Sequence, residues 1–271
     1  MKCKLCDTQE AKIESHIIPK FIFNWMKESG TGRLRQLKSF NMPQQDGIKT
    51  HMLCEGCELK FSISEKWFFE KVFKEYLSGK CIIHYNNELH YFIVSLLWRV
   101  LVYFKDDGNE YFHKGLMDKA EKELKNYLLL YEKLQEFSDF YMIMLPEEML
   151  GVNKIKNFDE YFFRTVDMDI AVSSQKCFIY AKFPRFIFIG NITGLNENDF
   201  RGIKIHTSGG EISNRFTITD PDILDFLLSR ISAMKGYEEL SEKQKKIVAQ
   251  RTRKNINKYL KSDYWRIIRK K

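Results

Sequence analysis

The spacing of apolar residues changes several times along the chain, and each spacing predicts a different kind of element. Between residues 64 and 77 large apolar side chains recur every three or four positions, which is typical of one buried face of a helix. Residues 88–104 are almost continuously apolar and predict a buried helix, whereas residues 113–137 alternate charged and apolar positions in an amphipathic pattern. A shorter helix is predicted over residues 21–27.

From residue 141 onward, short runs rich in aromatic and β-branched residues replace the helical spacing. Glycine, proline, serine and asparagine residues separate these runs and indicate turns. We expect strands at residues 141–145, 161–172, 176–183 and 186–189, with two shorter strands at 203–206 and 215–218. This pattern predicts an antiparallel sheet of four to six strands.

Two helices are predicted after the sheet. Asp220 stands directly before Pro221, and this pair is a favourable N-cap and first helical residue for one of them. Ser241 is followed three residues later by Gln244, a capping-box pattern that predicts a last helix over residues 242–261. That last helix has few apolar residues and many cations.

The amino-acid composition narrows the class of protein. The chain of 271 residues is 44% hydrophobic and 30% charged, which is typical of a folded globular protein. Its most apolar run, residues 91–104, includes Arg99 and is shorter than a membrane span. Lys2, Lys4 and Asp7 lie where a signal peptide would need apolar residues. We therefore expect a cytoplasmic protein that does not associate with membranes.

The net charge of +8 is distributed unevenly. Residues 243–271 contain twelve lysines and arginines and one acid, Asp263, which sum to +11 and leave −3 for the rest of the chain. A basic segment on a nearly neutral body is expected of a protein that binds a polyanion such as nucleic acid. The competing interpretation is a solvated basic tail without a partner. The cations expected to contact phosphates are Lys245, Lys246, Arg251, Arg253, Lys254 and Lys258.

Four of the six cysteines form two Cys-x-x-Cys pairs, Cys3 with Cys6 and Cys54 with Cys57. Two residues between cysteines allow a tight turn to direct both thiolates at one ion, and two such pairs supply four ligands for Zn²⁺. Because the protein fills all four positions, this zinc would be structural rather than catalytic. Cysteines used in this way also indicate a reducing compartment without disulfides.

A histidine between the two cysteine pairs extends the pattern. His16 lies ten residues after Cys6, is followed by Ile-Ile-Pro, and precedes a Leu-Cys-x-x-Cys sequence that should open a helix. This arrangement resembles the zinc-stapled HNH, or His-Me finger, endonucleases. The resemblance implies a ββα unit in which His16 ends a strand near residues 12–17 and acts as general base on the water that attacks a phosphodiester. It also implies a second metal, Mg²⁺ or Mn²⁺, that neutralises the leaving oxygen.

Three positions depart from the family pattern. Ser15 replaces the acidic ligand that commonly precedes the histidine, Lys49 replaces the asparagine, and Glu58 follows the fourth cysteine in place of histidine or asparagine. Since hard cations prefer carboxylate oxygens, Glu58 and Glu14 are the candidate ligands of the catalytic metal. Glu65 shares a helical face with Glu58, but we expect it to be an exposed acid rather than a ligand.

These observations predict an α+β fold with a ββα zinc unit, a helical segment, an antiparallel sheet and C-terminal helices. The expected domains are a nuclease domain over residues 1–80 and an α+β domain over residues 81–271. The expected function is metal-dependent hydrolysis of phosphodiester bonds in DNA, with RNA as an alternative substrate and prokaryotic defence as a role by analogy. The competing hypothesis is a non-catalytic zinc-stapled protein that binds nucleic acid or another partner, and a homodimer is compatible with either.

Overall fold

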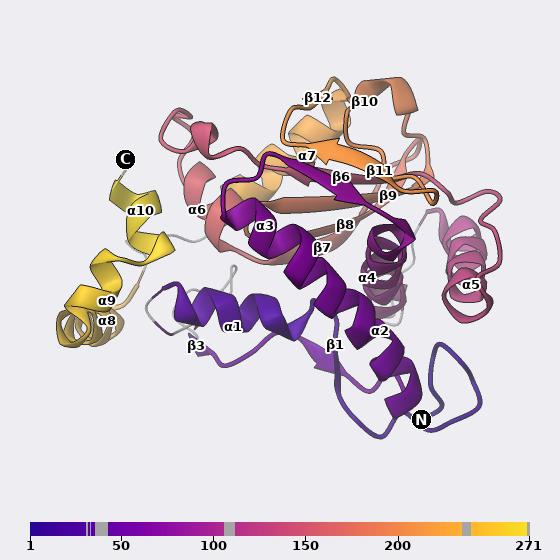
Figure 1. The fold of residues 1–271 in the computed structure, drawn as a ribbon, viewed down its shortest axis with the longest axis horizontal. Helices are drawn as coiled ribbons and strands as arrows, with labels where there is room; N and C mark the ends of the chain where they lie inside the picture. Colours follow the sequence, from indigo (N-terminus) through magenta and orange to yellow (C-terminus); the bar gives the residue numbers. More distant parts are fainter. Residues whose placement is uncertain (31, 33, 36–42, 106–111, 235–239, 270–271) are drawn as a thin grey trace.

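A four-stranded antiparallel sheet with helices on both faces forms the centre of the molecule (Figure 1). The computed structural model describes residues 1–30, 32, 34–35, 43–105, 112–234 and 240–269. The N-terminal unit lies beneath the sheet in this view, and the C-terminal helices lie at one end of the molecule. The α+β class predicted from the sequence is confirmed.

The central sheet has the strand order β6–β9–β8–β7, and each neighbouring pair is antiparallel. Its strands are β6 (Phe140–Met144), β7 (Asp167–Val172), β8 (Cys177–Phe183) and β9 (Phe186–Thr193). Every residue of β6 and β8 is buried, because both faces of the sheet are covered. Successive side chains point to opposite faces, so the sheet separates two apolar cores.

The larger core lies between the sheet and helices from the first half of the chain. These are α2 (Glu55–Phe68), the π-helical turn η1 (Phe69–Phe73), α3 (Lys74–Leu77), α4 (Asn87–Lys105) and α5 (Lys114–Leu130). Helix α4 packs on all four strands and is buried from Leu89 to Val102, as its continuous apolar sequence predicts. The ring of Phe68 on α2 lies 4.1 Å from that of Phe92 and 5.5 Å from that of Phe186, so aromatic contacts connect these helices to the sheet.

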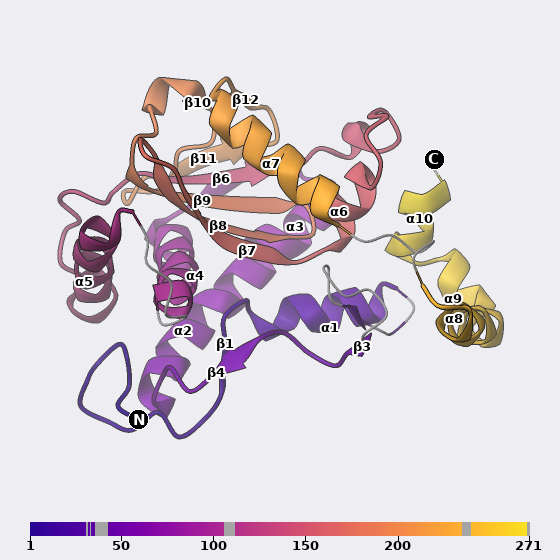
Figure 2. The ribbon, with the colours of Figure 1, turned by 180° about the vertical axis from the view of Figure 1, so that it is seen from behind.

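The smaller core lies on the opposite face of the sheet, beneath α6 (Phe158–Arg164) and α7 (Pro221–Ala233) (Figure 2). Helix α7 begins as predicted, because the Asp220 carboxylate accepts hydrogen bonds from the backbone N–H groups of Asp222 and Ile223. This cap supplies partners for donors that the first turn of a helix leaves unsatisfied.

Two strand predictions are wrong. Residues 161–164 belong to α6 rather than to a strand, and Tyr161 and Phe163 are fully buried there. Packing of these rings outweighs the strand preference of aromatic residues, which depends strongly on context. Residues 203–206 form no strand, and only Lys204 makes a bridge, to Tyr141.

Short elements complete the fold. The two-stranded sheets are β1 (Ser15–His16) with β4 (Lys49–Thr50), β2 (Leu34–Arg35) with β3 (Pro43–Gln44), β5 (Ile82–Tyr85) with β11 (Gly210–Ser213), and β10 (Phe200–Arg201) with β12 (Thr217–Ile218). The 3-10 turns are η2 (Glu147–Met149) and η3 (Glu197–Asp199). Strand β5 was not predicted, because its partner β11 lies far away in the sequence.

Helix α5 ends earlier than the amphipathic pattern predicts. Tyr131 adopts a left-handed conformation with φ 57°, which stops the helix after Leu130. The Glu123 carboxylate then accepts hydrogen bonds from the backbone N–H groups of residues 135–137. These contacts replace the helical hydrogen bonds that residues up to 137 would otherwise make.

The C-terminal segment, residues 240–269, contains α8 (Glu242–Lys254), α9 (Ile256–Leu260) and α10 (Asp263–Arg269). Its predicted start is confirmed, since the Ser241 hydroxyl accepts a hydrogen bond from the N–H of Gln244. The single helix expected over residues 242–261 is interrupted at Asn255, which has non-helical ψ.

Asp263 anchors this segment to the body of the protein. Its carboxylate lies 2.6 Å from Nη2 of Arg185 and 3.2 Å from Nη1 of Arg164, whose side chains are 1% and 8% exposed. Burial would raise the pKa of Asp263, but these guanidinium groups lower it. Ile267 is fully buried in the smaller core. The basic segment is therefore a docked part of the fold rather than a free tail.

The larger core contains residues on both sides of position 80, from Cys3 to Ile212. The predicted domains, residues 1–80 and 81–271, thus share one apolar interior, and the division into two domains stays a prediction. Within the described ranges, no helix combines the length and the apolar character that crossing a membrane requires.

Candidate zinc centre and histidine site

The four paired cysteines meet at the N-terminal end of α2. Their sulfur atoms all lie within 4.8 Å of one another, and Cys6 Sγ is 3.8 Å from Cys54 Sγ. A tetrahedral ion with Zn–S bonds of about 2.3 Å separates its sulfur ligands by roughly 3.8 Å, so this spacing fits Zn²⁺. All four cysteines are free of disulfides. The prediction that Cys3, Cys6, Cys54 and Cys57 form a cluster able to hold a structural zinc is confirmed.

Contacts around the cluster favour metal binding. The N–H of Lys4 donates to the carbonyl of Met52 at 2.8 Å, which holds the first cysteine pair against the residues before α2. Although burial opposes ionisation of Cys6, the Thr8 hydroxyl donates to its sulfur at 3.1 Å and helps lower the pKa of Cys6 to about 6. Burial raises the pKa of Cys57, so its thiolate needs a cation nearby.

His16 lies on the first strand of the same N-terminal unit. In the antiparallel pair β1–β4, His16 stands opposite Lys49, and α2 follows β4 after a short connection (Figure 2). The two strands and the helix therefore have the β-β-α order that the sequence motif implies. Strand β1 is shorter than expected, but the N–H of Ile17 still donates to the carbonyl of Ile48 at 3.1 Å.

Arg99 holds the backbone of His16 from α4. Its Nη1 donates to the carbonyl oxygen of His16 at 2.9 Å and lies 2.8 Å from Oε1 of Glu65. The Arg99 side chain is 1% exposed and that of Glu65 is 18% exposed, so the expectation that Glu65 is an exposed acid is wrong. Burial raises the pKa of Glu65, against the opposing effect of Arg99. One guanidinium thus connects α4, α2 and β1.

The imidazole of His16 faces an acid that sequence analysis missed. Oδ2 of Asp46 lies 3.0 Å from Nε2 of His16 and 3.2 Å from Nζ of Lys49. The first pair has the distance of an ion pair without hydrogen-bond geometry, and Nε2 has no hydrogen-bond partner in the described part of the chain. Burial would raise the pKa of Asp46, but His16, the N–H of Gly47 and Lys49 lower it to about 2. Asp46 is therefore ionised at neutral pH.

The two acids predicted to bind a catalytic metal lie in different settings. Glu58 is in the first turn of α2, and its Oε2 is buried without a hydrogen-bond partner among the described residues. Glu14 is exposed. Among the residues that the structure describes, only the four cysteines bring three or more ligand atoms within 4.8 Å. Assignment of Glu58 and Glu14 to Mg²⁺ stays a prediction.

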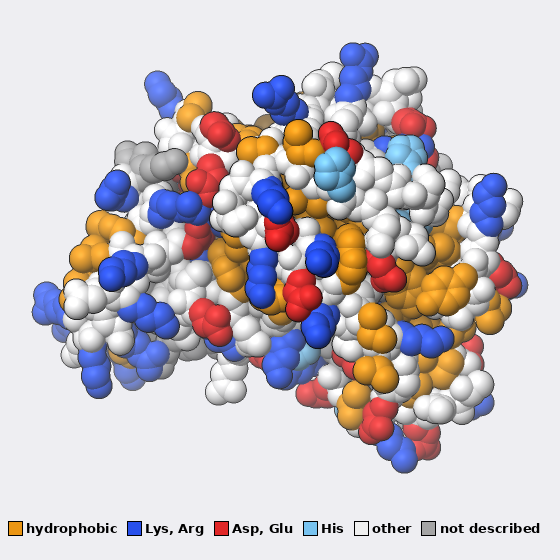
Figure 3. All heavy atoms as spheres, in the orientation of Figure 1, with side chains coloured by type: hydrophobic (Ala, Val, Ile, Leu, Met, Phe, Trp, Pro, Cys, Tyr) orange, Lys and Arg blue, Asp and Glu red, His pale blue; other side chains and the backbone are white. Residues whose placement is uncertain are grey.

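The cations predicted to contact nucleic acid lie on α8 and α9. Figure 3 shows lysine and arginine side chains gathered over these helices. Lys245 is half-buried and pairs with Glu242 at 3.0 Å, whereas the five others are exposed. Nη2 of Arg35 on β2 donates to Oε1 of Gln244 at 3.1 Å, which connects α8 to the N-terminal unit. Nucleic-acid binding by this surface stays a prediction.

Sequence analysis missed Arg99 and Asp46, and the sequence around these two residues differs in how far it indicates their roles. Arg99 is the one strong charge inside the apolar run 91–104, and a buried charge needs a partner. That rule points to a buried ion pair but not to Glu65. Asp46 lies in an irregular stretch before the second cysteine pair, and nothing in its neighbourhood distinguishes it from a surface turn residue.

No protein-family model matches this chain, and no curated protein or solved structure is significantly similar to it.

Replacing Arg99 with methionine should destabilise the protein by about 3 kcal/mol, because the half-buried Glu65 carboxylate would lose its partner. Urea unfolding followed by circular dichroism measures this loss. The double variant Arg99→Met/Glu65→Leu should recover most of it, since no charge is then left unpaired. If the double variant is as unstable as the single variant, the hydrogen bond of Arg99 to the His16 carbonyl contributes more to stability than its ion pair with Glu65.

Proposed function

We propose that this protein is a metal-dependent endonuclease of the HNH type that hydrolyses phosphodiester bonds in DNA. One observation supports this most directly: His16 lies 3.0 Å from the ionised Asp46 on a β-β-α unit whose helix begins at the cysteine cluster. A histidine whose one ring nitrogen faces a carboxylate is equipped to act as a general base through its other nitrogen. The sequence motif around His16 supports the same reaction.

In this proposal His16, Asp46 and Arg99 act together in the transfer of a proton. His16 accepts a proton from the attacking water, and Asp46 favours the imidazolium that results. Arg99 holds the His16 backbone in place, so the imidazole keeps its position relative to the substrate.

A divalent ion, when bound, would neutralise the charge that develops on the leaving oxygen. Mg²⁺ usually keeps several waters and binds proteins through one or two carboxylates, so a cluster of three protein ligands is not required. Asp46 would supply suitable oxygen atoms, and so would Glu58, whose Oε2 has no hydrogen-bond partner among the described residues.

Plasmid cleavage tests this function. Supercoiled DNA incubated with the purified protein and Mg²⁺ or Mn²⁺ should be nicked or linearised, and EDTA should stop the reaction. Absence of cleavage with both ions, together with salt-sensitive binding of DNA, would contradict the endonuclease.

The second candidate function is a zinc-stapled protein that binds nucleic acid without cleaving it. It is favoured by the position of Lys49, whose Nζ lies 3.2 Å from the Asp46 carboxylate and competes there with a metal ion. If this ion pair blocks catalysis, Lys49→Ala should gain metal-dependent cleavage that the parent protein lacks. An inactive Lys49→Ala variant that still binds DNA would support the non-catalytic function.

Neutralising three cations of α8, in the variant Lys246→Gln/Arg253→Gln/Lys254→Gln, should weaken duplex DNA binding in a salt-dependent manner. Each lost phosphate contact lowers the slope of log K against log salt concentration by about 0.9, so three lower it by about 2.7. The matched control replaces three exposed lysines of α5, Lys114, Lys119 and Lys122, at the other end of the molecule (Figure 1). Equal slopes in the two variants would mean that α8 does not follow the DNA backbone.

A further inference from the structure

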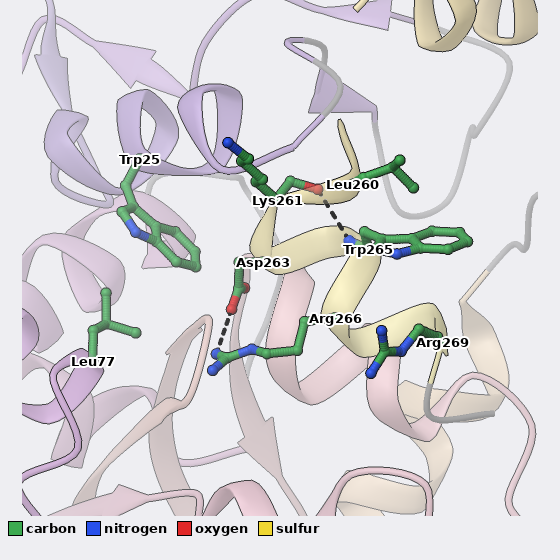
Figure 4. A pocket seen from close by; sticks show the side chains of 9 residues that line it. Trp25, Leu77, Leu260, Lys261, Asp263, Trp265, Arg266 and Arg269 are labelled. Atoms are coloured by element: carbon green, nitrogen blue, oxygen red, sulfur yellow. Dashed lines mark hydrogen bonds and ion pairs between the residues drawn. The ribbon is translucent and has the colours of Figure 1, made fainter. Parts of the chain in front are cut away.

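Two hollows lie between the C-terminal segment and the region around α1 (Lys20–Glu28). The larger has a volume of about 470 Å³, and its lining includes Trp25, Lys261, Asp263, Trp265, Arg266 and Arg269 (Figure 4). The smaller has a volume of about 150 Å³, and its lining includes Gly30, Arg251, Lys258 and Tyr259. We call the surface that joins these two hollows the seam.

The seam is strongly cationic. Among the described residues, Arg251, Lys258, Lys261 and Arg269 have no ion-pair partner, so their charges are available to a ligand. The one acid in the lining, Asp263, is already neutralised by the arginines that anchor it. An anion that enters the seam therefore meets several free positive charges and no free negative one.

The seam also presents aromatic rings. Trp265 on α10 is half-buried, and its ring lies 5.3 Å from that of Tyr259. Trp25 on α1 is held by Phe73 and Arg164, at ring distances of 5.3 Å and 5.0 Å, and forms a fixed wall. In Figure 4 the two tryptophans lie on opposite sides of Asp263, with Lys261 between them. Cations interleaved with aromatic faces are the combination that binds single-stranded nucleic acid.

We propose that the seam between α1 and the C-terminal segment binds single-stranded DNA, with bases against Trp265 and Tyr259 and phosphates on Arg251, Lys258 and Lys261. This proposal rests on the endonuclease function and specifies its substrate. Only unpaired bases can place a flat face on an aromatic ring, because the bases of a duplex are stacked on one another. A duplex presents no unpaired base to these rings and has no reason to enter the seam.

The position of α1 connects the seam to His16. Helix α1 starts four residues after His16 and ends just before Gly30, which lines the smaller hollow. Its nine residues rise roughly 14 Å. Helix α1 therefore connects the edge of the seam to the strand that carries His16.

Fluorescence anisotropy with labelled oligothymidylate and a duplex of equal length, each of about 20 units so that it exceeds one binding site, tests the proposal. EDTA is present, so cleavage does not interfere. Trp265→Ala should bind oligothymidylate about ten-fold more weakly, the loss of one stacked base, and bind the duplex unchanged. Trp265→Phe keeps an aromatic ring, so its affinity for oligothymidylate should fall about three-fold or less. This variant controls for damage to α10.

A charge-matched pair of variants tests the cations. Lys258→Ala/Lys261→Ala should lower the salt slope for oligothymidylate by about 1.4, because each single-strand phosphate contact contributes about 0.7. Lys243→Ala/Lys246→Ala removes the same charge from α8 outside both hollows, and should weaken single-strand binding no more than duplex binding. The proposal would be overturned if the ratio of oligothymidylate affinity to duplex affinity were the same in the two variants.

Two other results would also overturn it. Trp265→Ala could weaken both ligands equally, which would mean that no base stacks in the seam. Oligouridylate could bind more than about ten-fold more tightly than oligothymidylate, which would assign the seam to RNA, whose 2′-hydroxyl is then read. If single-strand binding is absent while plasmid cleavage still depends on His16, this inference fails and the endonuclease function stands.

Discussion

Alanine at position 16 is expected to lower DNA cleavage by about three orders of magnitude, in the range that removal of a general base produces. DNA binding and thermal unfolding should change little. The contacts of this residue with Arg99 and β4 use its backbone, and Asp46 keeps its ion pair with Lys49 when the imidazole is removed. Plasmid nicking rates and melting by circular dichroism measure the two effects separately.

The pH dependence of cleavage adds to this test. The pKa of Asp46 is lowered to about 2, so Asp46 is fully ionised above about pH 4 and loses its charge only as the pH falls toward 2. An acid limb in the rate profile near neutral pH therefore belongs to another group, and histidine is the side chain that ordinarily titrates there. Asp46→Asn should reduce cleavage about 10- to 100-fold, the cost of removing a residue that positions a functional side chain.

His84→Ala is the matched control for the His16 variant. The His84 side chain is 81% exposed on β5, outside the proposed site, so its removal should leave cleavage unchanged. If His16→Ala keeps more than about one tenth of the parent rate, the base is a different residue.

The second large effect is expected from Cys54→Ser. Cys54 is the N-cap of α2 and contributes one of the four sulfur atoms, so its loss should release zinc and leave the other three thiols without a closed site. Structural zinc supplies folding free energy, about 10–16 kcal/mol in isolated zinc fingers. We therefore expect the N-terminal unit to unfold, with a lower melting temperature and exposure of Phe61, which packs against Trp98 of α4 at 6.1 Å.

Zinc content by atomic absorption and melting temperature by circular dichroism, both measured on Cys54→Ser, test this prediction. Cys81→Ser is the control, because Cys81 is an exposed cysteine outside the cluster. That variant should retain about one zinc per chain, as a four-cysteine site implies. A Cys54→Ser protein with the zinc content and melting temperature of its parent would exclude these four ligands.

The sequence by itself determined the elements that depend on neighbouring residues. The Cys-x-x-Cys spacing fixed which sulfur atoms could share an ion, and the structure brings those atoms together. The apolar run predicted α4 to within about one residue at each end, and the caps at Asp220 and Ser241 marked the starts of α7 and α8. Side-chain spacing and capping act over a few residues, so they can be read locally.

The tertiary structure decided whatever depends on residues far apart in the chain. Arg99 reaches His16 from α4, and Asp46 meets the imidazole only because β1 and β4 pair in one register. Tyr161 lies on a helix because both its ring and its hydroxyl find partners beside the sheet. A chain can satisfy such distant groups in many ways, and packing of the complete core selects one of them.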